Sequence, residues 1–292
     1  MPTTIHLVRH AQGFHNLTTA NHSLPDPLLT PHGLEQCRAL SQTFPSPTSI
    51  THLVSSPLRR TLYTTLYSFP SVVSRGVKVV ALPEIQETSD LPCDTGSDVG
   101  VLREEFDAGE FKGMVDLGLV KEGWNDKTGG RFEPSSGAIQ ARAREARVWL
   151  RGLGKDYEGE GDVNVVVVTH GGFLHYFTED VSQHTYTYIF IPFLHHSSFS
   201  PPQIELIINP KQWEDSAKFS GTGWENTEFR SYRFVDEKGD DANASVKETR
   251  ESRERRNGSE KELTREEQEN LRRVTEDSWG GGGLLSEEEG KK

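Results

Sequence analysis

Arginine and histidine side chains occur where apolar runs of the sequence give way to polar residues. They are Arg9, His10, Arg59, Arg60 and His170. A guanidinium group can hold phosphate oxygens through paired hydrogen bonds, and a neutral imidazole can attack phosphorus and form a phosphohistidine. These residue types therefore suit phosphoryl transfer, provided that the fold brings them to one place.

The apolar runs predict strands, and the segments between them predict helices. The runs are Ile5–Val8, Ile50–Val54, Val77–Leu82 and the segment "VNVVVVT" that precedes His170. Unbroken valine indicates burial on both faces of a parallel sheet. Helices are expected after Thr30, which can cap a helix with Pro31 at its first position, and over Leu58–Phe69, Val99–Asp107 and Ala138–Leu153. Strands that alternate with helices indicate an α/β fold.

In such a sheet, ligands bind beyond the carboxyl ends of the strands. Two imidazoles and at least two guanidiniums would meet in one crevice, where helix N-termini also favour an anion. The reaction further needs a carboxylic acid that protonates the leaving oxygen and later deprotonates water. Glu84 and Glu87, after the third strand, can both supply it.

At this point the residues resemble the signature of the histidine phosphatase superfamily, also called phosphoglycerate-mutase-like. The resemblance covers roughly residues 4–235, and "LTPHGLEQ" is similar to the family's "LTxxGxxQ". The variant "RHAQGxHN", together with "PCDTGS" and "GTGWENTEFRSY", looks closest to a fungal branch. The signature itself is matched by Arg9-His10, by the stretch Ser56–Thr61 and by His170-Gly171.

The resemblance implies a three-layer α/β/α fold with a mostly parallel central sheet. It also implies His10 as the nucleophile, a phosphate pocket formed by Arg9, Arg60 and His170, and Arg59 as the variable position. Two further residues would bind substrate, namely Asn16 and Gly171. No cofactor and no metal are expected, since this chemistry needs none and no metal-ligand spacing of His or Cys occurs.

Two positions depart from the family pattern or leave it ambiguous. Ala11 stands where the family has glycine after the nucleophile. For the acid, the spacing to "PCD" favours Glu87, while the pattern "L-x-E" fits Glu84 as well; we prefer Glu87. His15 and His175 lie near the site in sequence and are secondary candidates for its lining.

The domain organisation is predicted as a catalytic domain over residues 1–235 and a charged, largely disordered tail over 236–292. Within the domain, residues 181–212 interrupt the family pattern and carry only two charged side chains, Glu205 and Lys211. We interpret the segment as a retained intron translated in frame. The alternative is a true insertion that supplies an extra strand or an apolar patch.

Composition limits the possible partners and compartments. A net charge of −12 argues against nucleic acid, and no apolar run is long enough for a membrane span. Two cysteines and no visible secretory signal indicate a reduced protein of the cytoplasm, or alternatively of the nucleus.

We therefore expect a phosphatase that acts on a small phosphomonoester. A phosphoglycerate-type mutase is the catalytic alternative, and a pseudoenzyme that binds a phosphorylated ligand is the non-catalytic one. The sequence predicts neither the physiological substrate nor the oligomeric state.

Overall fold

The computed structural model describes residues 2–159, 161–179, 224–236 and 238–255, which belong to one compact unit. The predicted insertion at 181–212 and the chain after residue 255 lie outside the described residues. The helices and strands are β1 (Thr3–Arg9), α1 (Pro31–Thr43), β2 (His52–Ser55), α2 (Arg59–Ser68), α3 (Pro70–Val73), β3 (Val79–Ala81), α4 (Val99–Phe106), β4 (Val115–Asp116), α5 (Ser136–Asp156), β5 (Val163–Thr169), α6 (Gly171–Phe177), β6 (Phe229–Phe234), β7 (Val246–Glu248) and α8 (Arg250–Arg255).

The strands form one sheet of seven in the order β4-β3-β2-β5-β1-β6-β7. The five from β4 to β1 are parallel, whereas β6 and β7 pair antiparallel at one edge. In the register of the central strands, Arg9 lies opposite Thr169, and Ser55 lies opposite Val168. The carboxyl ends of β1, β2 and β5 therefore lie side by side, and the residues that follow them start from one edge of the sheet.

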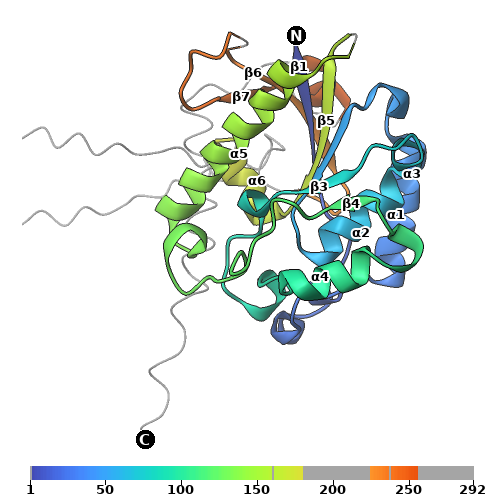
Figure 1. Ribbon diagram of the computed structural model, residues 1–292, viewed down its shortest axis with the longest axis vertical. Coiled ribbons are helices and arrows are strands. Elements are labelled where there is room, and N and C mark those ends of the chain that lie inside the picture. Colours follow the sequence, from blue (N-terminus) through green and yellow to red (C-terminus); the bar gives the residue numbers. More distant parts are fainter. Residues whose placement is uncertain (1, 160, 180–223, 237, 256–292) are drawn as a thin grey trace, which may run out of the picture. The chain divides into compact units, whose positions relative to one another are not determined.

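Helices cover both faces of the sheet (Figure 1). On one face, Val166 and Val168 pack into a core with residues of α1, α2, α3 and α4. On the other face, Val165 and Val167 pack against α5 and α6. Successive side chains of a strand point to opposite faces, so the valine run of β5 fills both cores. The predicted α/β fold with three layers and a mostly parallel sheet is confirmed.

The predicted start of the first helix is also confirmed. The Thr30 hydroxyl accepts a hydrogen bond from the Gly33 N–H at 3.0 Å, and Pro31 occupies the first helical position. Such a cap satisfies one of the free N–H groups of the first turn. A Cβ at Gly33 would lie 2.2 Å from the Gln12 carbonyl oxygen. The glycine therefore lets α1 approach the loop that follows the nucleophile position.

The C-terminal edge of the sheet corrects the domain boundary predicted at residue 236. Val246 and Ala244 are buried, and β7 pairs with β6 through Tyr232 and Phe234. Ser252 of α8 is also buried, and its hydroxyl accepts a hydrogen bond from the Ser231 N–H at 2.9 Å. The charged composition after residue 236 hid these few buried side chains, and ordered structure continues to Arg255.

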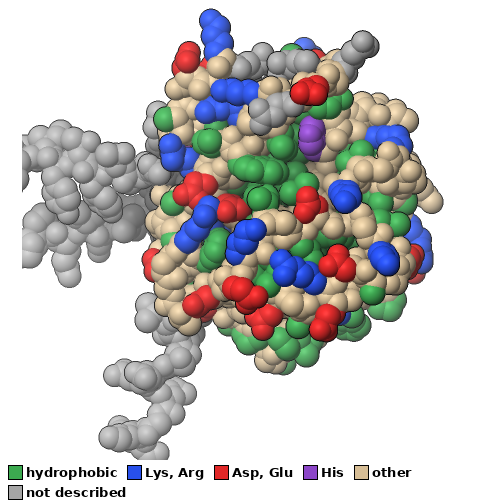
Figure 2. All heavy atoms as spheres, viewed as in Figure 1, with side chains coloured by type: hydrophobic (Ala, Val, Ile, Leu, Met, Phe, Trp, Pro, Cys, Tyr) green, Lys and Arg blue, Asp and Glu red, His purple; other side chains and the backbone are tan. Residues whose placement is uncertain are grey.

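On the face shown in Figure 2, cationic and anionic side chains are interspersed. That face offers no extended basic surface of the kind that binds a nucleic-acid backbone. Among the described residues, no helix combines the length and the apolar character that crossing a membrane requires.

Candidate functional site

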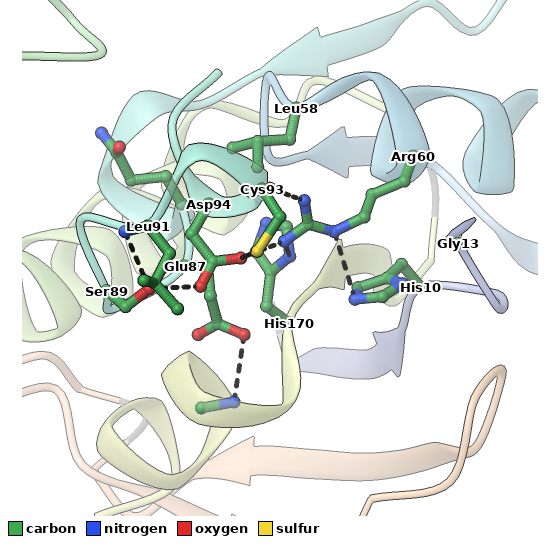
Figure 3. A network of polar contacts seen from close by, with 12 residues as sticks. His10, Gly13, Leu58, Arg60, Glu87, Ser89, Leu91, Cys93, Asp94 and His170 are labelled. Atoms are coloured by element: carbon green, nitrogen blue, oxygen red, sulfur yellow. Dashed lines mark hydrogen bonds and ion pairs between the residues drawn. The ribbon is translucent and has the colours of Figure 1, made fainter. Parts of the chain in front are cut away.

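The buried guanidinium of Arg60 lies at the centre of the candidate site. Arg60 is the second residue of α2 and is fully buried. Its Nε donates a hydrogen bond to His10 Nε2 at 3.3 Å, and its Nη2 donates to His170 Nδ1 at 3.0 Å. The two imidazole rings lie with their centroids 5.2 Å apart. Three residues far apart in the sequence thus meet at one point (Figure 3).

His10 is held as a neutral imidazole in one tautomer. Its Nδ1 lies 2.8 Å from the Ala11 carbonyl oxygen, which can only accept, so Nδ1 carries the proton. Burial lowers the pKa of His10 well below its ordinary value, and the Arg60 and Arg9 guanidiniums lower it further. Nε2 therefore carries no proton, and its lone pair, which accepts the hydrogen bond from Arg60 Nε, is the one a nucleophile requires.

His170 is neutral in the opposite tautomer. Its Nδ1 accepts from Arg60, and its Nε2 donates to the Ser56 hydroxyl at 2.8 Å. Burial is the main reason that the pKa of His170 lies well below its ordinary value, with Arg60 and His10 as further causes. Ser56 follows β2, so the hydrogen bond ties the ends of β2 and β5 together.

Arg9 is the last residue of β1 and lies at the border of the site. One terminal nitrogen of its guanidinium donates to the Trp224 carbonyl, while its Nε is buried and has no hydrogen-bond partner among the described residues. The segment that contains Trp224 also contacts the nucleophile, because Asn226 Nδ2 donates to the His10 carbonyl at 2.8 Å. The free Nε is a donor available to an anion. Burial is the largest cause that lowers the pKa of Arg9.

Glu87 lies at the first turn of α6, next to His170. Its carboxylate accepts hydrogen bonds from the N–H groups of Thr88 at 2.9 Å, Phe173 at 3.0 Å and Gly172 at 3.3 Å. Desolvation raises the pKa of Glu87, and the nearby Asp94 carboxylate raises it further. In Figure 3 the Glu87 carboxylate points toward the backbone of α6.

Glu84, the other predicted acid, lies elsewhere. Its carboxylate pairs with Arg131 at 2.6 Å, and Arg131 also pairs with Glu145 of α5. The structure therefore brings Glu87, and not Glu84, to the end of the sheet where His170 lies.

Asp94 is a site residue that the sequence reading did not identify. Its Oδ1 accepts from Arg60 Nη2 at 2.9 Å, and its Oδ2 accepts from the Ser89 hydroxyl at 2.6 Å. The preceding residue, Cys93, contributes its carbonyl to Arg60 Nη1 at 2.5 Å. The motif "PCD" served only as a spacing marker for Glu87, because no local pattern of the sequence brings Asp94 to Arg60.

Two buried cations hold the backbone that carries these carboxylates. Lys127 donates to the carbonyls of Glu87 and Ser89, both at 2.7 Å, and Arg142 of α5 donates to the carbonyls of Glu84, Gln86 and Glu87 at 2.6–3.0 Å. Burial lowers the pKa of Lys127 to about 8 and that of Arg142 to about 10. Both residues were missed, although an arginine on the apolar face of a predicted helix is a signal for a buried contact.

The remaining predicted residues differ in their relation to the cluster. Gly171 begins α6, where a Cβ would lie 3.3 Å from Arg9 Nε. His15 is buried, and its ring centroid lies 5.3 Å from that of His10. Asn16 is exposed, and its carboxamide oxygen accepts from the Gly13 N–H at 3.0 Å. The described hydrogen bonds do not connect Asn16 with Arg60. Arg59 pairs with Glu105.

The imidazoles and guanidiniums of the site suit the binding of an oxyanion rather than of a cation. Within the described part of the chain, no group of three or more His, Cys, Asp or Glu residues is placed to hold a metal ion. Neutral imidazoles and guanidiniums that surround one point can bind a tetrahedral anion and present a nucleophile to it.

Several solved structures are similar to this chain. A mycobacterial glucosyl-3-phosphoglycerate phosphatase is 18% identical, with a TM-score of 0.47 and coverage of 85% of this chain and 97% of that one. A phosphoserine phosphatase from Entamoeba histolytica is 14% identical, with a TM-score of 0.43 and coverage of 85% and 95%. An ecdysone phosphate phosphatase from Bombix mori is 13% identical, with a TM-score of 0.47 and coverage of 79% and 89%.

Sequence comparison finds a match over part of the chain. No curated protein sequence matches the chain. Residues 5–90 match the model of the histidine phosphatase superfamily (branch 1), a segment that includes Arg9, His10, Arg60 and Glu87. This match shows that the segment from residue 5 to residue 90 is similar to the histidine phosphatase superfamily.

Proposed function

We propose that this chain is a phosphatase that hydrolyses a phosphomonoester through a phosphohistidine on His10. The observation that carries the proposal is the bonding of one buried guanidinium, Arg60, to the imidazoles of both His10 and His170. A guanidinium so placed binds a phosphoryl group beside the nucleophile and stabilises the charge on its oxygens as it transfers.

The tautomer of His10 fits the attack. As its Nε2 lone pair forms a bond to phosphorus, the ring becomes cationic, and its Nδ1 proton stays bonded to the Ala11 carbonyl. Arg9 can offer a phosphate oxygen its buried Nε, which no hydrogen bond of the described part of the chain occupies. A carboxylic acid must protonate the leaving oxygen and later accept a proton from the attacking water; the sequence predicts Glu87 for this role.

The test is phosphate release from p-nitrophenyl phosphate by the wild type and by His10→Ala. We expect the variant to retain less than about one ten-thousandth of the wild-type activity, because the covalent route is lost. The wild type should also form a phosphoenzyme that is labile in acid and stable in alkali, which His10→Ala should not form. His32→Ala, at an exposed histidine of α1, is the matched control and should retain wild-type activity.

The alternatives give different results. Equal phosphate release by wild type and His10→Ala would refute the proposal. A mutase would transfer its phosphoryl group to an added hydroxyl acceptor faster than to water, and a pseudoenzyme would bind phosphate without turnover.

The finer assignments are part of the same proposal. The motifs "RHAQGxHN" and "PCDTGS" support a fungal branch of the family. We further propose a small phosphomonoester as the substrate and the cytoplasm as the compartment. A panel of sugar phosphates, phosphopeptides and nucleotides, compared by kcat/KM, would identify the substrate class.

A further inference from the structure

We propose that Lys127 is a positioning residue for Glu87, because its ammonium group fixes the turn that carries the Glu87 carboxylate and places a positive charge beside it. The inference rests on the phosphatase function proposed above, with Glu87 as the acid. Lys127 lies in the irregular chain between β4 and α5, 40 residues after Glu87. Its side chain is buried, which is rare for lysine unless the ammonium is paired.

The Lys127 ammonium closes the turn formed by Glu87, Thr88 and Ser89. Its Nζ donates hydrogen bonds to the carbonyls of Glu87 and Ser89, both at 2.7 Å. Within the turn, the Thr88 N–H donates to the Glu87 carboxylate at 2.9 Å. Because both carbonyls must point at one nitrogen, the ammonium fixes the shape of the turn and, through the Thr88 N–H, the direction of the carboxylate.

The same turn connects Lys127 with Arg60. The Ser89 hydroxyl donates to Asp94 Oδ2 at 2.6 Å, and Arg60 Nη2 donates to Asp94 Oδ1 at 2.9 Å. Figure 3 shows the Asp94 carboxylate between Ser89 and the Arg60 guanidinium. One ammonium therefore holds the backbone of the acid and, through Ser89, the carboxylate that pairs with Arg60.

The chain around Lys127 is joined to the segment of the acid by hydrogen bonds in both directions. Gln86 Nε2 donates to the Trp124 carbonyl at 2.9 Å, and Asn125 Nδ2 donates to the Gly96 carbonyl at 2.8 Å. The Trp124 side chain is itself buried. The position of Lys127 is therefore fixed by its neighbours as well as by its own two hydrogen bonds.

The charge of Lys127 opposes the causes that hold a proton on Glu87. Burial and then the Asp94 carboxylate raise the pKa of Glu87, whereas Arg60 and Lys127 lower it. In the proposed reaction Glu87 gives its proton to the leaving oxygen and regains one from the water that attacks phosphorus. A group with both tasks works best when its pKa lies near the operating pH. The Lys127 charge keeps the pKa of Glu87 from rising out of that range.

Charged and titratable groups from each neighbouring element interact with Glu87 or with Lys127. They are Arg9 of β1, Arg60 of α2, Arg142 of α5, His170 after β5 and Asp94 of the irregular chain. Burial lowers the pKa of Lys127 to about 8, so the ammonium keeps its charge at neutral and acidic pH. Replacing Lys127 by a neutral residue therefore removes one positive charge from this set and leaves the others in place.

The pH dependence of kcat/KM tests the proposal. β-Glycerophosphate is the substrate, because its alkyl leaving group needs a proton. Activity that depends on protonated Glu87 declines as the pH rises through the pKa of this group. In Lys127→Met that decline should move to higher pH. We expect the fraction of maximal kcat/KM that remains at pH 8 to be about three- to tenfold larger in the variant than in the wild type. Each fraction refers to the enzyme's own maximum, so a uniform loss of folded enzyme cancels.

Further variants separate the charge from the contacts. Lys127→Arg keeps the charge and should keep the wild-type decline. If Lys127→Met folds poorly, Lys127→Gln, which keeps an N–H donor and loses the charge, should show the same move to higher pH. Glu87→Gln should lose the decline altogether, which identifies the group that causes it. Lys121→Met removes an exposed charge from the same irregular chain and should follow the wild-type profile.

Three results would overturn the proposal. An unchanged decline in Lys127→Met, with only a loss of stability, would make Lys127 a purely structural residue. An equal move to higher pH in Lys127→Arg would show that the charge is not the cause. A decline that persists in Glu87→Gln would belong to another group. All three compare the shapes of profiles and are distinct from failure of the phosphatase proposal, which the His10→Ala comparison detects.

Discussion

The two sides of the candidate site are built in different ways. The imidazole side, defined as His10, Arg60, His170 and Ser56, comes from residues at the ends of central strands or in the first turn of α2. The carboxylate side, defined as Glu87 and Asp94, comes from irregular chain between β3 and α4. The sheet register and the start of α2 bring the first side together, whereas the second depends on remote side chains.

The chain after β3 is irregular, so its carbonyls have no neighbouring strand or helix turn to supply hydrogen-bond donors. Two side chains from distant positions supply these donors instead. Backbone carbonyls that are buried outside regular structure still need donors. Lys127 and Arg142 supply them between Glu84 and Ser89 through five hydrogen bonds. Substitutions on the imidazole side should therefore act through chemistry, whereas substitutions of the cations that support the carboxylate side should act largely through stability.

The largest expected effect is on the imidazole side. Arg60→Lys keeps the charge but loses the fork that contacts His10, His170 and Asp94 together. We expect kcat/KM for p-nitrophenyl phosphate to fall by about 10²–10³-fold, the loss typical of one missing transition-state donor. Arg59→Lys is the neighbouring control and should change activity by less than about threefold. Equal losses in the two variants would contradict the central role of Arg60.

The second effect should appear on the carboxylate side as lost stability. Arg142→Met leaves the carbonyls of Glu84 and Gln86 without a side-chain donor, while that of Glu87 keeps Lys127, and it removes a cation from the Phe173 ring, whose centroid lies 4.9 Å away. We expect a loss of about 3 kcal/mol in the free energy of unfolding by urea. Arg144→Met, at an exposed position of α5, should lose less than about 0.5 kcal/mol. Similar losses in both would show that the carbonyl contacts contribute little.

The difference between strand ends and irregular chain also explains which site residues the sequence predicted. The strand ends, the capped helix after Thr30 and the double burial of β5 follow from local patterns, and the structure confirms them. His10, Arg60 and His170 were therefore predictable as neighbours. Asp94 and Lys127 were not, because their positions depend on irregular backbone that has no periodic pattern. The strand β6 was also missed, since its buried residues include the polar Arg230 and Ser231 and do not alternate with exposed ones.

A smaller effect should come from crowding the carboxylate side. At Gly172, a Cβ would lie 2.5 Å from Glu87 Oε1, so Gly172→Ala must displace that carboxylate. We expect a loss of about 2 kcal/mol in the free energy of unfolding, as for other overpacked sites. Gly137→Ala in α5 meets nothing within 4 Å and should instead raise stability by about 0.5–1 kcal/mol. Stabilisation by both substitutions would mean that Glu87 moves without cost.

The smallest effect concerns the acid sensitivity of the imidazole side. Burial, and then Arg60, lower the pKa of His15 to about 3, below its ordinary value of 6.5. Between these two values the unfolded chain binds a proton at His15 that the folded chain does not, so stability falls as the pH falls.

The substitution His15→Gln removes the group that binds this proton. Its free energy of unfolding should therefore fall less steeply than that of the wild type between pH 6 and 4, by about 1.4 kcal/mol per pH unit. His32→Gln, at an exposed histidine, should follow the wild-type curve. Parallel curves for His15→Gln and the wild type would mean that His15 takes up its proton in the folded protein, and that the imidazole side is more open to water than its burial indicates.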